Sequence, residues 1–162
     1  MTTWTNTTLV PIVIAGGAAL AVAVAGGLAT RIGPWYQQLA KPSWQPPDWL
    51  FGPVWTLIFA LIAAAGVRAW WDVPPGNARN TVIALFVVNG ALNVLWSVLF
   101  FALRRPDWAL WEVALLWLSI VALIVFIAGH SSTGAWLLVP YLMWVSFASV
   151  LNWSIVRLNS PF

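Results

Sequence analysis

Five long stretches with almost no charge limit this sequence more than any other feature. They span about residues 9–30, 49–71, 81–103, 108–128 and 134–156, and each is close to the roughly 20 residues that a helix needs to cross about 30 Å of hydrocarbon. Of the 162 residues, 62% are hydrophobic and only 7% are charged, which leaves too little polar surface to cover a soluble domain. We therefore expect a single all-α domain, an integral membrane bundle of five transmembrane helices.

The same stretches argue against other architectures. A membrane β-barrel needs alternating segments of about ten residues, whereas these stretches are continuous and rich in Leu, Ala and Val. No basic residue precedes the first stretch, which is also longer than the core of a signal peptide, so we interpret it as a retained span. The chain has no cysteine and a single histidine, His130, and we therefore expect neither disulfides nor a metal site.

Basic residues lie at the ends of the apolar stretches and form no patch that would bind nucleic acid. Their distribution instead indicates the topology. One side of the membrane would hold only Arg68 and Arg79, whereas the first and third loops and the C-terminal tail hold Arg31, Lys41, Arg104, Arg105 and Arg157. Because loops rich in positive charge stay in the cytoplasm, we expect a cytoplasmic C-terminus and an N-terminus outside.

The segment that follows the first stretch is rich in proline and tryptophan. Residues 35–55, WYQQLAKPSWQPPDWLFGPVW, contain four prolines and four tryptophans. Proline fixes φ and lacks an N–H donor, so residues 41–47 should form a semi-rigid extended cover. Asp48 precedes Trp49 and is a candidate N-cap of the second helix. We expect this first loop to act as an aromatic lid on the bundle.

Small residues recur at every fourth position of the first stretch, at Ala15, Ala19, Ala23 and Gly27. Such a stripe lets a second helix approach closely. The sequence favours packing inside the bundle over a dimer interface at this stripe.

Polar side chains also occur inside the apolar stretches. Asn89, Asn93 and Ser97 are four residues apart and share one helix face. Two interpretations are equally open for them, hydrogen bonds between helices and contact with a ligand. Glu112 lies near the start of its stretch, where we expect it to stay solvated or to pair with one of the two preceding arginines rather than to relay protons.

Several of the 14 tryptophans lie too deep for the interfacial belt in which indoles usually collect. Trp144 is about 15 Å into the last stretch, near the middle of the bilayer. Trp96 and Trp117 are also well inside, and Trp55 is about one turn within the second stretch. The last stretch carries a stripe with four-residue spacing, made up of Pro140, Trp144, Ala148 and Asn152. These residue types suit a cavity for a large, flat, apolar ligand with a few polar edges; a tryptophan-packed core without a ligand is the alternative.

Four segments resemble the signature segments of the TspO/MBR family, the tryptophan-rich sensory proteins and mitochondrial translocator proteins: WYQQLAKPSWQPP, FGPVWT, ALNVLWSVLFF and PYLMWVSFASVLN. They occur in the expected order, and the similarity covers about residues 31–157. The resemblance implies a five-helix bundle, often dimeric, with a pocket that opens toward the cytoplasmic half beneath the first loop. It also implies binding of porphyrins, such as protoporphyrin IX and haem, and of synthetic benzodiazepine-type and isoquinoline carboxamide ligands.

The resemblance also indicates which residues would contact the ligand. Carried over by motif, they are Tyr36, Pro47, Trp55, Asn93, Trp96, Trp144, Ala148 and Asn152. A porphyrin would be the ligand, and no cofactor would be required. In the sterol-associated pattern of the animal members a Tyr precedes a Lys or Arg. Here Trp153 takes the Tyr position before Arg157, which argues against sterol binding.

Three functions are compatible with these residues. The first is a receptor or sensor that binds porphyrins and regulates tetrapyrrole or stress responses. The second is an enzyme that degrades protoporphyrin IX with light and oxygen, as family members are reported to do, with Trp55 and Trp144 as the candidate catalytic residues. The third is a transporter of porphyrin or lipid, against which the absence of an internal repeat argues. We favour the binding protein, because no acid, base or nucleophile is predicted in the pocket.

Overall fold

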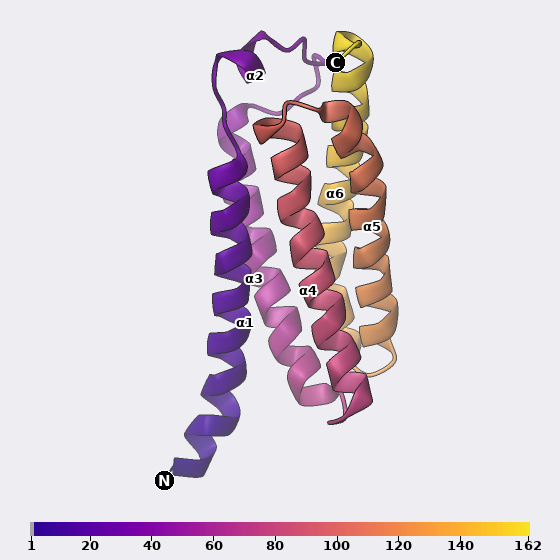
Figure 1. Ribbon diagram of the computed structural model, residues 1–162. Coiled ribbons are helices and arrows are strands. Elements are labelled where there is room, and N and C mark those ends of the chain that lie inside the picture. Colours follow the sequence, from indigo (N-terminus) through magenta and orange to yellow (C-terminus); the bar gives the residue numbers. More distant parts are fainter. Residues whose placement is uncertain (1) are drawn as a thin grey trace.

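The structure is a computed structural model that describes residues 2–162, with side chains from residue 8 onward. Its elements are α1 (Thr2–Ala29), α2 (Pro34–Gln38), α3 (Asp48–Asp72), α4 (Asn77–Ser97), the π-helix η1 (Val98–Ala102), α5 (Pro106–Ala128) and α6 (Ser132–Asn159) (Figure 1). If α4 and η1 are counted together, five helices in the described part are long and apolar enough to cross a membrane. The prediction of an all-α bundle with five spans is confirmed.

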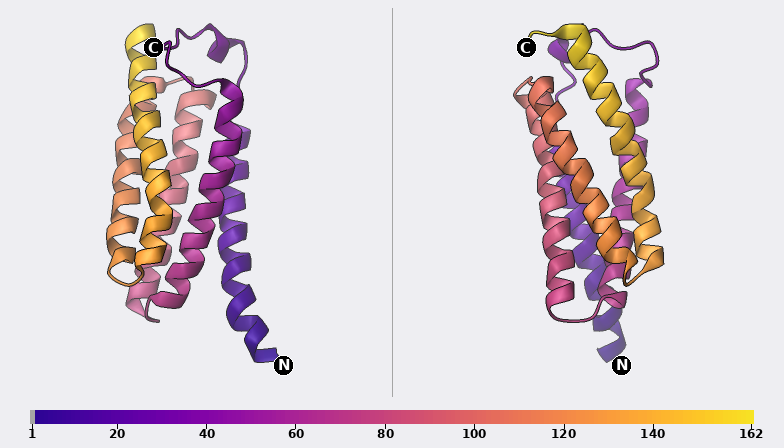
Figure 2. Two further views of the ribbon diagram at one scale, coloured as in Figure 1. Left: turned by 180° about the vertical axis from the view of Figure 1, so that it is seen from behind. Right: turned by 90° about the vertical axis from the view of Figure 1, so that its right-hand side faces the viewer.

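The five long helices run side by side and form a ring in the order α1, α4, α5, α6 and α3 (Figures 1 and 2). Each packs mainly against its two neighbours in this ring. Residues 30–47, which join α1 to α3 and which we call the strap, lie at the same end of the bundle as the C-terminus (Figure 1). Large apolar side chains such as Val13, Val87 and Val125 are exposed, as contact with acyl chains requires.

Two elements differ from the sequence-based expectation. The helix expected from residue 81 begins at Asn77. Gly76 has a φ of 102°, which favours glycine, and its carbonyl accepts a hydrogen bond from Asn80 N at 3.0 Å. Residues 77–80 therefore form the first turn of the helix. The sequence analysis missed this turn because its residues are mostly polar and a search for apolar stretches does not detect them. The strap also contains the short helix α2, which Pro34 starts because its fixed φ suits a first helical position.

Glu112 does not lie where the sequence analysis placed it. Its side chain is buried, and neither carboxyl oxygen has a hydrogen-bond partner among the described residues. Arg105 instead binds Asp107, with its Nε donating to Oδ1 at 2.8 Å. The expectation that Glu112 stays solvated or pairs with an arginine is wrong. Because α5 starts at Pro106, Glu112 is nearly two turns into the helix and faces the packed interior together with Ala109.

A buried hydrogen-bonded network joins α4, α5 and α6. Asn93 Nδ2 donates to the hydroxyl of Tyr141 at 3.1 Å, and this hydroxyl donates to Asn89 Oδ1 at 3.3 Å. Asn89 Nδ2 in turn donates to Ser119 Oγ at 2.8 Å. Tyr141 is only 1% exposed. The interpretation of these asparagines as links between helices is therefore confirmed, which fixes three of the five helices relative to one another.

We predict that Tyr141→Phe lowers the free energy of unfolding by about 1–2 kcal/mol, because it leaves polar groups of both asparagines without a partner in a dry interior. Thermal unfolding in detergent, followed by circular dichroism, measures the effect. Ser154→Ala is the matched control, since its hydroxyl bonds Val150 O of its own helix, and it should leave the midpoint unchanged. Equal midpoints for wild type and Tyr141→Phe would contradict the prediction.

Candidate functional site

A cavity of about 830 Å³ lies inside the ring, next to the strap. It is lined by side chains from α1, α3, α4, η1, α5, α6 and the strap, and its lining is mostly apolar. The volume is within the range of about 300–1,000 Å³ that small-molecule sites occupy. A solid tryptophan-packed core, the alternative that the sequence left open, is therefore wrong for this half of the bundle.

The structure brings most of the predicted site residues together around this cavity. The lining includes Tyr36, Trp55, Asn93, Trp96, Trp144, Ala148 and Asn152. Pro47 is the exception, because it is exposed at the start of α3 and does not line the cavity. The next residue, Asp48, does line it. Contact of these residues with a ligand stays a prediction.

Aromatic neighbours hold the indoles of the cavity wall in place. Trp96 stacks on Phe100 with ring centroids 5.1 Å apart, and Trp144 stacks on Phe147 at 5.3 Å. Trp144 also meets the edge of Phe51 at 5.6 Å. The Nε1 atoms of Trp96 and Trp144 are buried and have no hydrogen-bond partner among the described side chains. Because an unpaired buried donor costs free energy, the wall carries two N–H groups that would gain from an acceptor on a ligand.

The amides around the cavity are used mainly by the protein itself. Asn93 donates to Tyr141, as described above. In the orientation that satisfies both of its amide groups, Asn152 donates to Pro106 O and accepts from Leu110 N, each at 3.1 Å. Asn152 thus borders the cavity with its aliphatic part and ties α6 to the first turn of α5. Its polar group is not free for a ligand.

One deep tryptophan has a different role from the one its depth indicated. Trp117 does not line the cavity, and its Nε1 donates to Ser146 Oγ at 2.8 Å across the α5–α6 contact. Depth alone therefore does not separate an indole of the wall from one that packs two helices together.

Two groups of wall residues escaped the sequence analysis. The small residues of α1 face the bundle interior: a Cβ at Gly66 would lie 3.5 Å from that of Ala15, while Ala19, Ala23 and Gly27 line the cavity. Packing inside the bundle in preference to a dimer interface stays a prediction for this stripe, and its contribution to the cavity wall could be recognised only with the neighbouring helices in place. Phe100 and Phe101 reach the cavity through η1, a π-helix that no pattern of residues indicated.

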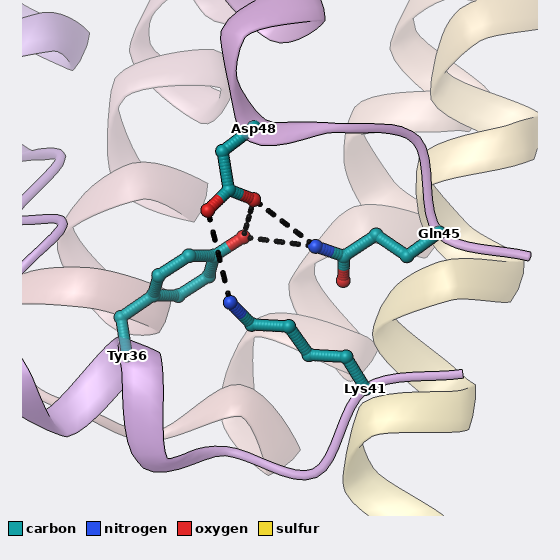
Figure 3. Close-up of polar contacts among 4 residues, drawn as sticks. All are labelled: Tyr36, Lys41, Gln45 and Asp48. Atoms are coloured by element: carbon teal, nitrogen blue, oxygen red, sulfur yellow. Dashed lines mark hydrogen bonds and ion pairs between the residues drawn. The ribbon is translucent and has the colours of Figure 1, made fainter. Parts of the chain in front are cut away.

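A polar cluster lies where the strap meets α3 (Figure 3). Tyr36 OH donates to Asp48 Oδ1 at 3.0 Å, and Gln45 Nε2 donates to the same oxygen at 3.1 Å. Lys41 Nζ lies 3.8 Å from Asp48 Oδ2 and 3.8 Å from the centre of the Tyr36 ring. Asp48 was expected to be an N-cap; instead Pro47 takes that position without a side-chain bond, and the Asp48 carboxylate holds the strap.

This cluster changes the acidity of the tyrosine. Burial first, and then the neighbouring Asp48 carboxylate, raise the pKa of Tyr36 from 10.0 to about 12. Tyr36 and Asp48 are the titratable residues that line the cavity in the described part of the chain, and they come from the strap and from the start of α3. No group of three His, Cys, Asp or Glu in that part is arranged to hold a metal ion. The deeper wall offers stacking surface and N–H donors.

Comparisons with known proteins give matches over most of the chain. The model of the TspO/MBR family matches residues 12–158. Tryptophan-rich protein TspO of Chlorobaculum tepidum is 40% identical over 156 residues, which are 95% of this chain and 99% of that protein. The human translocator protein is 35% identical over 127 residues, 77% of this chain and 75% of that protein. The tryptophan-rich sensory protein of Cereibacter sphaeroides is 34% identical over 125 residues, 77% of each chain.

The raised pKa of Tyr36 predicts a loss of stability in strong base. Because the folded protein favours the neutral phenol, Tyr36 contributes stability below pH 10 that is lost as the pH rises from 10.0 to about 12. The thermal midpoint of the wild type should therefore exceed that of Tyr36→Phe below pH 10, and the difference should shrink toward pH 12. A difference that stays constant from pH 9 to pH 12 would contradict this assignment.

Proposed function

This chain belongs to the TspO/MBR family, and on that premise we propose that it is a receptor or sensor that binds porphyrins such as protoporphyrin IX and haem in the cavity of the bundle. Binding would regulate tetrapyrrole or stress responses. The protein needs no cofactor for this, since the porphyrin is itself the ligand.

The observation that carries the proposal is the aromatic wall of the cavity. A porphyrin is a flat, largely apolar ring system with carboxylates at its edge. The indoles of Trp55, Trp96 and Trp144 offer faces and edges for such a ring, and an offset or edge-on aromatic contact contributes about 0.5–1.5 kcal/mol. The two unpaired N–H groups of Trp96 and Trp144 would donate to polar atoms of the ligand. The wall therefore matches an aromatic ligand better than a lipid chain.

The chemistry of the wall supports binding over catalysis. General acid–base work needs a titratable side chain within reach of the reacting atoms, and the titratable residues that line the described cavity come only from the strap and the start of α3. Photochemical breakdown of protoporphyrin IX is the second candidate, because it would use indoles rather than acids and bases. Trp55 and Trp144 are its candidate catalytic residues.

The arrangement of charges supports an orientation in the membrane. The strap end of the bundle holds five basic residues, whereas Arg68 and Arg79 are in α3 and α4 at the opposite end (Figure 1). The five are Arg31 and Lys41 in the strap, Arg104 and Arg105 before α5, and Arg157 in the last turn of α6. By the excess of positive charge, the strap, the mouth of the cavity and the C-terminus would face the cytoplasm, and the N-terminus would lie outside. The homodimer implied by the family stays a prediction.

We predict that protoporphyrin IX quenches the tryptophan fluorescence of the protein in detergent, and that Trp144→Phe and Trp55→Phe each weaken the affinity about three- to tenfold, because each removes part of the stacking surface. Trp111→Phe is the matched control, since that side chain is 82% exposed and does not line the cavity. Affinities that are unchanged in both cavity variants would refute the assignment of the site.

Illumination separates binding from catalysis. The absorbance of bound protoporphyrin IX is followed in light and oxygen, and a binding protein should not accelerate the bleaching beyond that of the free pigment in the same detergent. Faster bleaching that disappears in Trp55→Phe and Trp144→Phe, but not in Trp111→Phe, would favour the enzyme instead.

A further inference from the structure

The cavity reaches the surface of the bundle on the side where α1 and α3 pack against each other. Leu20 of α1 and Trp49 of α3 line it, and they are 64% and 72% exposed. Gly16 and Ala60, on the same two helices, also line it and are exposed. The two helices lie side by side (Figures 1 and 2). On this side the contents of the cavity therefore border the acyl chains of the membrane.

A second hollow, of about 450 Å³, continues along the same helices away from the strap. It shares Gly16 and Ala63 with the lining of the cavity, so the two hollows meet at these residues. We call the second hollow the side groove. It is lined by Ile12 and Gly16 of α1, by residues of α3 between Ala63 and Trp71, and by Thr133 and Leu137 of α6.

Small residues produce the side groove. A Cβ at Gly16 would meet no other atom within 4 Å, and Ala63 and Ala64 follow on α3 with single methyl groups. Most of the lining is apolar. From Gly27 in the cavity to Ile12 in the side groove, α1 rises by about 22 Å at 1.5 Å per residue. Cavity and side groove together therefore form a long apolar path with aromatic rings at one end only.

The charges of the cavity wall bear on the edge of the ligand. In the described part of the chain, Asp48 is the one residue of the wall that carries a full charge at neutral pH, and no Lys or Arg lines the cavity. A carboxylate that leaves water without a cation or donors to hold it costs free energy. The unpaired N–H groups of Trp96 and Trp144 are neutral donors, and an ester carbonyl can accept from them. The wall therefore suits an esterified edge better than a free carboxylate.

We propose that the cavity and the side groove are one site for a tetrapyrrole that is esterified with a long alkyl or isoprenoid alcohol. The ring lies against the indoles of the cavity, and the chain leaves between α1 and α3 and lies in the side groove. The proposal deepens the proposed function and rests on it, because it names the class of tetrapyrrole that the same cavity prefers.

Tethering explains why such a chain, rather than a lipid, occupies the side groove. Lipid tails are as apolar as the groove, so the hydrophobic effect does not favour either place. A chain that is attached to a bound ring is held next to the groove, and its contact with the wall becomes an intramolecular event. The gain in affinity from the chain is then modest, roughly three- to tenfold, and comes from close packing.

Two neutral probes test the role of the chain. Protoporphyrin IX dimethyl ester and the mixed methyl hexadecyl diester have the same ring and differ in one alkyl chain. Both are titrated against the full-length protein in lipid nanodiscs by tryptophan quenching, and each affinity is corrected for partition into nanodiscs without protein. The hexadecyl ester should bind about three- to tenfold more tightly than the dimethyl ester. Free protoporphyrin IX should bind more weakly than the dimethyl ester, because its carboxylates must be desolvated.

Variants of the side groove locate the effect. Ala64 and Val67 line the side groove and not the cavity. Ala64→Leu and Val67→Phe should each reduce the advantage of the hexadecyl ester to less than about twofold, because they fill the groove. Both should leave the affinity for the dimethyl ester unchanged. Ala91→Leu is the matched control, since Ala91 is exposed on α4 and lines neither hollow, and it should keep the full advantage.

Three results would overturn the proposal. Equal corrected affinities of the two esters for the wild type would show that the chain stays in the bilayer. An advantage that survives both Ala64→Leu and Val67→Phe would place the chain elsewhere on the protein. Tighter binding of free protoporphyrin IX than of the dimethyl ester would show that the wall recognises carboxylates. Circular dichroism verifies that each variant keeps its helices.

A photoreactive chain shows its position directly. The hexadecyl ester is prepared with a diazirine at the end of the chain, irradiated in nanodiscs with the wild type, and the modified residues are identified by mass spectrometry. Modification should fall on residues 63–71 and on the facing parts of α1 and α6, and an excess of the plain hexadecyl ester should suppress it. Modification only of lipid, or of the outer faces of α4 and α5, would overturn the proposal.

The same titrations separate this inference from the proposed function. A wild type that binds neither protoporphyrin IX nor either ester would refute both. A wild type that binds the dimethyl and hexadecyl esters equally well would overturn the tail site and leave the proposed binding of porphyrins intact.

Discussion

The need to satisfy every backbone polar group within the bilayer governs this structure. Helices satisfy this need with their own backbone hydrogen bonds. Five helices in a ring enclose a central space, which side chains either fill or leave open. Here α1 contributes small residues such as Ala19 and Ala23, while α3, α4 and α6 contribute large rings. The rings are held upright by their aromatic neighbours and do not collapse onto α1. The cavity results from this mismatch in size.

Polar groups in the interior divide into those that hold the bundle together and those that have no hydrogen-bond partner among the described residues. The network around Tyr141 and the amide of Asn152 tie three helices to one another. The indole N–H groups of Trp96 and Trp144 have no such partner among the described residues. A rigid half of the ring therefore faces the cavity with donors in fixed positions, which is the arrangement that recognition without large rearrangement requires.

The strap is attached in a different way. The strap is stiffened by prolines but is attached through side chains, chiefly Asp48 and Asn159. These attachments join the first loop to the start of α3 and to the end of α6, which are far apart in the sequence.

The five helices could be predicted from the amino-acid sequence, because lipid imposes a length and an apolar composition that a pattern of residues reveals directly. The sequence also identified Trp55, Trp96 and Trp144, since indoles at such depth have no interfacial role. The packing of the helices was needed to show that Trp117 and Asn152 bond to neighbouring helices, that Glu112 is buried without a partner among the described residues, and that Asp48 holds the strap. Each of these outcomes depends on which side chains two different segments bring together, and spacing along one helix carries no information about its neighbour.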